Sequence, residues 1–177
     1  MSAPTLRTER LILRPFRAED HAPLLRIWSE PRTLRHFARG PLPGDEVWTK
    51  ITRAVGHWHL MGYGYWAVIE KAGDALIGEV GFADFRRGIA ALDSPYEAGW
   101  VIDPDRHGQG FGREAVLAAQ DWLDRVFDRP RCQCLIAPGN DASLALARRA
   151  GYATDRLVVW RGGPSLLLER PAGSNAH

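Results

Sequence analysis

Apolar side chains recur every three or four residues in four segments of the chain, which is the spacing of a helix that buries one face. These segments are residues 18–29, 45–60, 110–127 and 140–150. In the second segment, the predicted buried stripe consists of Val47, Ile51, Ala54, Val55 and Trp58. Gly151 follows the last segment and favours the end of a helix there, because glycine readily adopts the conformation of a helix cap.

The remaining apolar segments are short and are bounded by residues that favour turns, as strands are. They are residues 10–15, 65–70, 75–85, 96–102, 131–136, 152–160 and 165–169. The predicted order is therefore β-α-α-β-β-β-α-β-α-β-β, a mixed α/β domain of the α+β type with one central sheet. We assign residues 1–170 to this single domain and residues 171–177 to a flexible tail.

The composition agrees with one globular domain and narrows the classes of partner. The chain has 177 residues, of which 45% are hydrophobic and 25% charged, and its formal net charge is +2. Such a small charge favours neither nucleic-acid binding nor attachment to an anionic membrane. No apolar run is long enough to span a bilayer, and the first seven residues lack the apolar region of a secretory signal. We therefore expect a cytoplasmic protein.

Cysteine and histidine usage predicts neither a disulfide nor a metal site. Cys132 and Cys134 lie one residue apart, so in a strand they point the same way and are poorly placed to bridge each other. Two ordinary thiols fit a reducing compartment. His57, His59 and His107 do not have the spacing of a zinc site. For His57 and His59, on a predicted helix, a structural or solvent-facing role is favoured over a catalytic one.

The segment 100–115 is the most informative part of the sequence. A buried strand runs into a glycine-rich loop, and the loop opens a long helix. The glycines of the loop are Gly108, Gly110 and Gly112. Because they lack Cβ atoms, an anion can approach the backbone N–H groups closely, and the positive end of the helix dipole points to the same place. Arg106 and Arg113 flank the loop and can add charge, so the sequence predicts a phosphate or pyrophosphate site.

Two other nucleotide-binding motifs use glycine-rich turns, but neither fits this spacing. A Rossmann site needs G-x-G-x-x-G after the first strand of a βαβ unit, whereas this loop reads G-x-G-x-G late in the chain. A P-loop needs G-K-[ST], which the sequence lacks. A glycine-rich turn without a ligand is the alternative interpretation.

The loop resembles the R/Q-x-x-G-x-G/A motif with which GNAT acetyltransferases bind the pyrophosphate of acetyl-CoA. His107 stands in the Arg/Gln place, and Gly110 and Gly112 match the invariant part. The resemblance extends over nearly the whole chain. Segments similar to the RimJ/RimL branch of the family are residues 6–15, 76–82, 140–143 and 150–152.

This resemblance implies a GNAT fold, in which a central, mixed, mostly antiparallel sheet splays open between flanking helices. The pantetheine arm of acetyl-CoA would lie in the gap along Trp100, Val101 and Ile102, with Asn140 and Ser143 on the other wall. The pyrophosphate would meet a loop made of Arg106, His107, Gly108, Gln109, Gly110, Phe111, Gly112 and Arg113. Asn140 is also suited to the N-cap of its helix, and both roles stay open.

Acetyl transfer needs a group that accepts a proton, because amines with pKa values of about 8 to about 10.4 are mostly protonated at neutral pH. Glu97 is the candidate base, since it interrupts an apolar strand just before the expected gap, where burial would raise its pKa. A solvent-facing strand residue is the alternative. Backbone N–H groups near Trp100 and Val101 are candidates for stabilising the oxyanion.

The resemblance places Ala147 where many family members carry the tyrosine that protonates the leaving thiolate. Ser143 or a water molecule could take that part, or the thiolate could leave unaided. We therefore predict an acetyl-CoA-dependent N-acetyltransferase that acts on a primary amine. The acceptor could be a protein N-terminus, a polyamine, an amino sugar or another small amine, and other acyl donors and a homodimeric state stay open. The alternative function is a non-catalytic, acyl-CoA-binding regulatory domain.

Overall fold

In the residues that the structure describes, 2–37 and 40–173 of this computed structural model, eight strands form one sheet. They are β1 (Leu6–Arg7), β2 (Leu11–Arg14), β3 (Tyr65–Glu70), β4 (Ala75–Ala83), β5 (Glu97–Ile102), β6 (Cys132–Ile136), β7 (Ala153–Trp160) and β8 (Gly163–Arg170). Their order across the sheet is β1-β2-β3-β4-β5-β6-β8-β7. Neighbouring strands are antiparallel except β5 and β6, which are parallel. The mixed, mostly antiparallel sheet is therefore confirmed.

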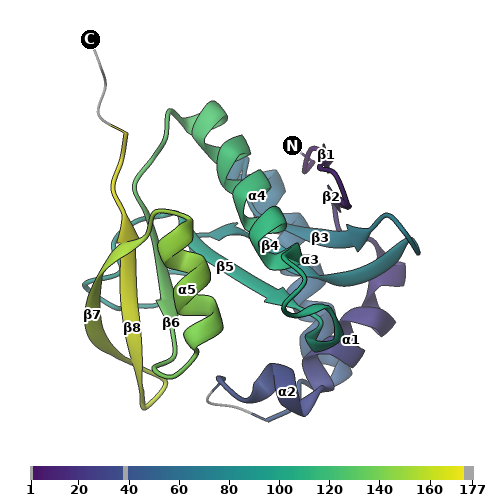
Figure 1. Ribbon diagram of the computed structural model, residues 1–177, viewed down its shortest axis with the longest axis horizontal. Coiled ribbons are helices and arrows are strands. Elements are labelled where there is room, and N and C mark those ends of the chain that lie inside the picture. The colour runs from purple at the N-terminus through teal and green to yellow at the C-terminus, as the bar shows by residue number, and fades with distance from the viewer. Residues whose placement is uncertain (1, 38–39, 174–177) are drawn as a thin grey trace.

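Helices cover both faces of this sheet (Figure 1). They are α1 (His21–Ser29), α2 (Pro31–Leu34), α3 (Gly44–Met61), α4 (Phe111–Phe127) and α5 (Asp141–Arg149), with 3-10 turns at Ala18–Asp20 and Pro104–Arg106. Ile27 of α1 and Ile51 of α3 share one buried cluster with Ile69 of β3. Ala119 of α4 and Leu144 of α5 belong to a second cluster. None of the helices in the described ranges is long and apolar enough to cross a membrane.

The contact between β5 and β6 is limited to one end of the two strands. Their register has a single pair, Glu97 opposite Gln133, whereas β4 and β5 pair along the whole length of β5. Gln133 is buried and ties this end down: its side chain accepts from the Ser94 N–H at 3.0 Å and donates to the Ala91 carbonyl at 3.0 Å. Beyond this pair the two strands diverge (Figure 1), so the sheet is splayed.

The element boundaries differ from the sequence-based ones in a few places. β4 ends at Ala83 instead of residue 85, and the last turn consists of Arg161 and Gly162, because β8 already begins at residue 163. β1 and α2 were not predicted, since they are too short to show a periodic pattern. Val55 was expected in the buried stripe of α3 but is 51% exposed, because it lies at the edge of that stripe. Residues 174–177 of the predicted tail lie outside the described residues.

Candidate active site

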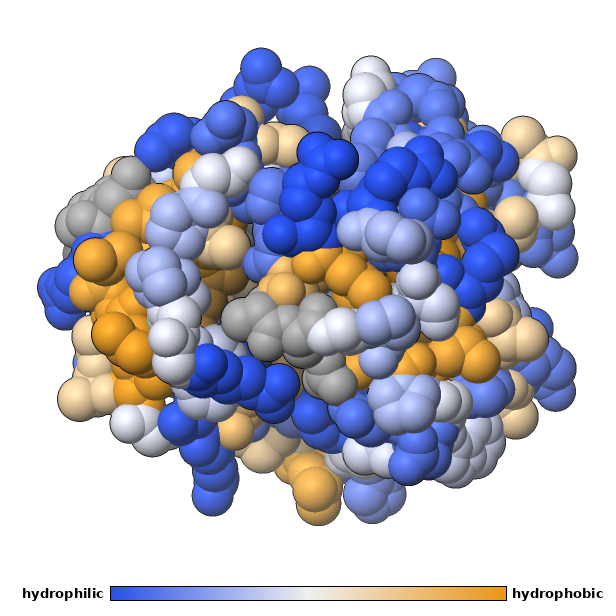
Figure 2. All heavy atoms as spheres, turned by 90° about the horizontal axis from the view of Figure 1, so that it is seen from below, coloured by the Kyte–Doolittle hydropathy of each residue, from blue (hydrophilic) through white to orange (hydrophobic). Residues whose placement is uncertain are grey.

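A cavity of about 450 Å³ opens where β5 and β6 diverge. Its lining includes Lys50 of α3, Tyr65 of β3 and Glu97 of β5 on one side, and Asn140 and Ser143 at the start of α5 on the other. Figure 2 shows the molecule from the side at which the two strands diverge, and there apolar surface lies among hydrophilic side chains. One cavity thus joins the α3 face of the sheet to the gap between its halves.

The hydrogen-bonding groups of β5 alternate between β4 and this gap. The Asp103 N–H donates to a β4 carbonyl at 2.7 Å, so the odd-numbered residues of β5 face β4. The Tyr96 carbonyl accepts from the Gln133 N–H at 3.1 Å, so the even-numbered residues face the other way. The N–H group of Trp100 therefore faces the gap. The Val101 N–H faces β4, contrary to the expectation that it could stabilise an oxyanion.

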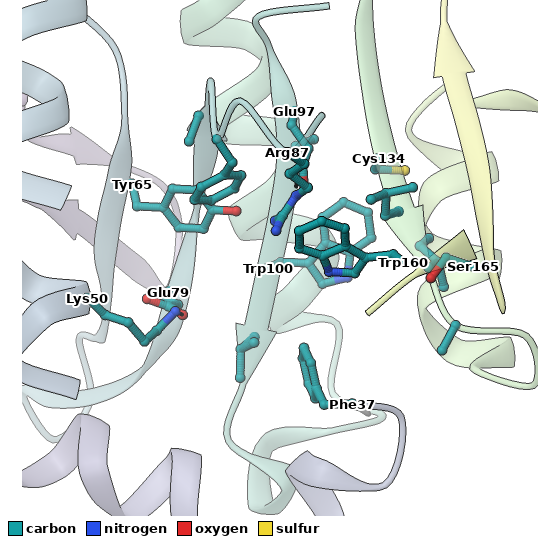
Figure 3. A pocket seen from close by; sticks show the side chains of 18 of the residues that line it. Phe37, Lys50, Tyr65, Glu79, Arg87, Glu97, Trp100, Cys134, Trp160 and Ser165 are labelled. Atoms are coloured by element: carbon teal, nitrogen blue, oxygen red, sulfur yellow. Dashed lines mark hydrogen bonds and ion pairs between the residues drawn. The ribbon is translucent and has the colours of Figure 1, made fainter. Parts of the chain in front are cut away.

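Glu97 lies at the closed end of the gap and is only 6% exposed, so the solvent-facing interpretation of this residue is wrong. Its carboxylate accepts three hydrogen bonds from Arg87, with Nε–Oε2 and Nη2–Oε1 distances of 2.8 Å each and an Nε–Oε1 distance of 3.1 Å (Figure 3). Burial raises the pKa of Glu97, and the Arg87 guanidinium opposes that rise. The carboxyl group is therefore shielded from bulk water, and it holds a proton more readily than an ordinary glutamate.

A second buried carboxylate, Glu79 of β4, also lines the cavity and is 4% exposed. Its Oε1 atom lies 2.9 Å from the Lys50 ammonium and accepts from the Trp28 indole N–H at 3.2 Å. Lys50 also lies over the Trp28 ring, 4.4 Å from its centroid. The sequence reasoning missed this group. Glu79 interrupts an apolar strand as Glu97 does, and that signal could have identified it.

Stacked cations and aromatic rings connect the two halves of the molecule beside the cavity. The Arg87 guanidinium lies 4.3 Å from the Phe85 ring centroid and 4.7 Å from that of Trp160 on β7. Each ring also contacts a second arginine: Arg53 of α3 lies 5.0 Å from the Phe85 ring centroid, and Arg161 lies 5.5 Å from that of Trp160. These contacts fix the position of Arg87, and therefore that of the carboxylate it binds.

The glycine-rich loop lies at the start of α4, as predicted. Gly110 is the N-cap residue of this helix, with φ of +83°, a conformation that glycine adopts without strain. Arg106 is turned away to Glu70, with an Nε–Oε2 distance of 2.8 Å. Arg10 lies beside the loop, and its Nη1 donates to the Gln109 carbonyl at 2.9 Å. The sequence reasoning missed Arg10, because 99 residues separate it from Gln109.

Other predicted residues of the loop have structural contacts of their own. The His107 ring nitrogen Nε2 lies 2.9 Å from the Ile102 carbonyl. The Gln109 side chain donates to the Asp105 carbonyl at 3.0 Å. Arg113 is exposed at the first turn of α4. These contacts hold the loop in shape.

Asn140 is the N-cap of α5, since its side-chain oxygen accepts from the Ser143 N–H at 3.2 Å. Both residues line the cavity, so the capping role does not remove Asn140 from its wall. His57 has a structural role: Nδ1 lies 2.7 Å from the Tyr63 carbonyl, and Nε2 accepts from the Asp84 N–H at 3.0 Å.

Within the described ranges, no group of histidine, cysteine and acidic side chains could hold a metal ion. Cys132 and Cys134 are buried and free of disulfides. The polar groups that line the cavity include the buried carboxylates of Glu79 and Glu97 and the Tyr65 hydroxyl.

Comparisons with known proteins identify the family of this chain. The family described as "Acetyltransferase (GNAT) domain" matches residues 10–153. The uncharacterised N-acetyltransferase p20 of Bacillus licheniformis is 27% identical over 157 residues, which are 87% of this chain and 85% of that protein. A GNAT-family acetyltransferase structure from Bordetella pertussis is 30% identical, with a TM-score of 0.84 over 95% of this chain and 99% of that one. RimL, a ribosomal L7/L12 α-N-protein acetyltransferase solved with coenzyme A, shares the fold at 17% identity, with a TM-score of 0.74 over 96% and 98% of the chains.

Proposed function

Because the chain belongs to the GNAT family of acetyltransferases, which use acetyl-CoA as their acyl donor, we propose that it acetylates a primary amine bound in this cavity. The observation that carries the proposal is the connection between a gap in the sheet and a buried carboxylate within one cavity. The gap exposes backbone N–H and C=O groups to a ligand, and the carboxylate supplies a base. Acetyl-CoA contributes the activated acetyl group as a thioester.

The gap fits the slender, amide-containing arm of acetyl-CoA. Trp100 turns its backbone groups towards it, and Val101 and Asn140 line the cavity. We assign Trp100, Val101 and Ile102 to one wall of the donor site. Asn140 and Ser143 form the other wall. In this arrangement the arm takes the place of the strand that β5 lacks on this side.

The start of α4 fits the pyrophosphate. Gly108 and Gly110 both have positive φ values, and the backbone here can present several N–H groups to one anion. We propose that the N–H groups of residues 108–112 bind the pyrophosphate, with Arg113 adding positive charge, since Arg10 is paired with Glu114 at 2.7 Å. Arg106 and His107 support the loop from behind through Glu70 and the Ile102 carbonyl.

Glu97 is the proposed base for the acceptor. An ammonium group entering the cavity would give its proton to this carboxylate, directly or through a water molecule, and the neutral amine would attack the thioester carbonyl. Burial favours such a transfer because it raises the pKa of Glu97 towards that of the amine. The Trp100 N–H, which faces the gap, is the proposed donor to the oxyanion.

The acceptor is a primary amine, either a protein N-terminal α-amine or a small molecule. RimL is named for the first of these, and it shares the fold with this chain. A thiol-release assay with acetyl-CoA and a panel of acceptors tests the proposal: a peptide with a free N-terminus, spermidine and glucosamine. At least one amine should accelerate thiol release and gain one acetyl group by mass spectrometry. Tight acetyl-CoA binding without acceleration by any amine would favour the regulatory-domain alternative.

A further inference from the structure

The Tyr65 side chain extends from β3 across the face of the sheet, over two glycines whose missing side chains leave room for it. It begins on β3, opposite Gly81 of β4, and Gly81 lies opposite Gly99 of β5. A Cβ atom on Gly99 would overlap with the Tyr65 hydroxyl, and one on Gly81 would overlap with the backbone of Gly64 and Tyr65. The phenol ring therefore passes over β4, and its hydroxyl ends above β5.

The Tyr65 hydroxyl lies near the proposed base, Glu97, and near the Trp100 N–H, the proposed donor to the oxyanion. Gly99 lies two residues from Glu97 and next to Trp100, whose N–H faces the gap. Figure 3 shows the Tyr65 side chain pointing from the α3 side towards Arg87 and Glu97. Glu97 and Glu79 both act electrostatically on this phenol.

This hydroxyl has no hydrogen-bond partner among the residues that the structure describes, although it lines the cavity. Polar groups in protein interiors are nearly always paired, because an unpaired one costs the desolvation energy of that group. Tyr63 illustrates the rule, since its hydroxyl donates to the Pro95 carbonyl at 2.8 Å. A hydroxyl held open in a reaction cavity is therefore available to a ligand.

Burial, with added repulsion from Glu97 and Glu79, raises the pKa of Tyr65 well above its ordinary value. The phenol consequently stays protonated at neutral pH. A protonated phenol can donate one hydrogen bond and accept others at the same oxygen. It can therefore pass a proton on while it receives another.

We propose that the Tyr65 hydroxyl is a catalytic group that carries the second proton of the reaction from the acceptor nitrogen to the sulfur of CoA. This inference rests on the proposed function. Glu97 removes the first proton, which turns the ammonium into an amine. The amine lone pair then forms the C–N bond, and the carbonyl π electrons move to oxygen.

When the C=O bond re-forms, the C–S bond breaks and its electron pair goes to sulfur. The Tyr65 O–H gives its proton to that sulfur, and the phenol oxygen receives the proton that the acetylated nitrogen loses. Tyrosine ends the cycle unchanged, and the products are the N-acetylated amine and the CoA thiol. The tyrosine comes from β3, across the cavity from Ser143, which was the candidate for this role from the sequence.

Tyr65→Phe tests the proposal, with Tyr63→Phe as the matched control and Ser143→Ala as the test of the rival proton donor. Tyr63→Phe also removes a phenol oxygen but lies outside the cavity lining. With the fastest acceptor of the panel, Tyr65→Phe should lower kcat by about 10²-fold and leave the KM for acetyl-CoA nearly unchanged. Tyr63→Phe should keep kcat within about threefold of the wild type.

A donor in which selenium replaces the CoA sulfur separates catalysis from positioning, because a selenolate leaves readily without a proton. The loss caused by Tyr65→Phe should shrink strongly with this donor. Gly99→Ala, which places a methyl group where the hydroxyl lies, should lower kcat in the same donor-dependent way.

An equal loss with both donors, or near-normal kcat in Tyr65→Phe, would overturn the proposal while leaving the proposed function intact. A loss in Ser143→Ala that the selenium donor rescues would assign the proton to Ser143 instead. Wild-type protein that acetylates no amine would overturn the proposed function, and this inference with it.

Discussion

Glu97→Gln tests the first proton transfer, since it keeps the shape of the side chain and removes its charge. In the native protein the carboxylate accepts from Arg87 at two distances of 2.8 Å. A glutamine side chain has one accepting oxygen, so one of these hydrogen bonds is lost and an amide N–H₂ faces the guanidinium. Losing a charge-assisted bond at a buried site should lower the free energy of unfolding by about 1–3 kcal/mol, which leaves the protein folded.

The kinetic effect should be larger than the effect on stability. General-base assistance contributes about 10²–10⁴-fold, so kcat at neutral pH should fall by that order while the KM for acetyl-CoA stays similar. The variant should recover as the pH rises, because more of the amine is then already neutral. The wild-type rate should level off above the raised pKa of Glu97.

The same substitution should change the pH dependence of stability. Because burial raises the pKa of Glu97, the folded protein retains this proton at pH values at which the unfolded chain has lost it. The free energy of unfolding therefore falls as the pH rises from the ordinary glutamate pKa, about 4.3, through the raised pKa of the folded state. Urea denaturation at a series of pH values should show this fall in the wild type and a flatter curve in Glu97→Gln.

Glu79→Gln is the matched control, because Glu79 is also a buried carboxylate in the cavity. Near-normal kcat in Glu97→Gln at neutral pH would remove Glu97 from the mechanism. If the loss of kcat and its recovery at high pH appear in Glu79→Gln instead, the base is Glu79. Reduced stability with an unchanged pH–rate profile would make Glu97 a structural residue.

Three further predictions concern the donor site and the ion pair. Acetyl-CoA at a hundredfold excess over Kd should raise the free energy of unfolding by about 2.7 kcal/mol, and NAD or ATP by much less; no thermal shift at millimolar acetyl-CoA would contradict the donor site. Gly110→Asp should abolish CoA binding measured by calorimetry, whereas Gly62→Asp, at a cap with a similar positive φ, should retain it; equal affinities would place the anion site elsewhere. Arg87→Met should cost about 3 kcal/mol in stability and move the plateau of the pH–rate profile to higher pH; an unmoved plateau would show that Glu97 does not set it.

Structural features that depend on a few consecutive residues could be predicted from the sequence. Val47, Ile51 and Trp58 mark the buried stripe of α3, and the structure buries all three. The glycine spacing predicted the loop at the start of α4, where Gly110 is the N-cap. Such patterns depend on local periodicity and on the conformational freedom of glycine, both of which a sequence displays directly.

The contacts between side chains of different strands and loops could not be predicted, because they depend on how the strands are paired and on their register. Tyr65 meets Gly99 only after β3, β4 and β5 have paired, and no local pattern connects residues so far apart. The pair of Arg87 with Glu97 likewise requires a loop to fold back over β5. Val55 shows that a local pattern can also predict too much. Its apolar side chain fits the helical spacing, yet it points away from the core and is half exposed.

The gap between β5 and β6 also bears on how this protein avoids aggregation. A row of unpaired N–H and C=O groups usually lies at the outer edge of a sheet, where it can recruit strands from other molecules. Here the row on β5 that includes Trp100 lies inside the sheet, closed at one end by Gln133 and flanked by β6. The outer edge at β1 is only two residues long. The other outer edge, β7, is eight residues long, so the protection applies to the unpaired row of β5, which stays open to a small ligand inside the sheet.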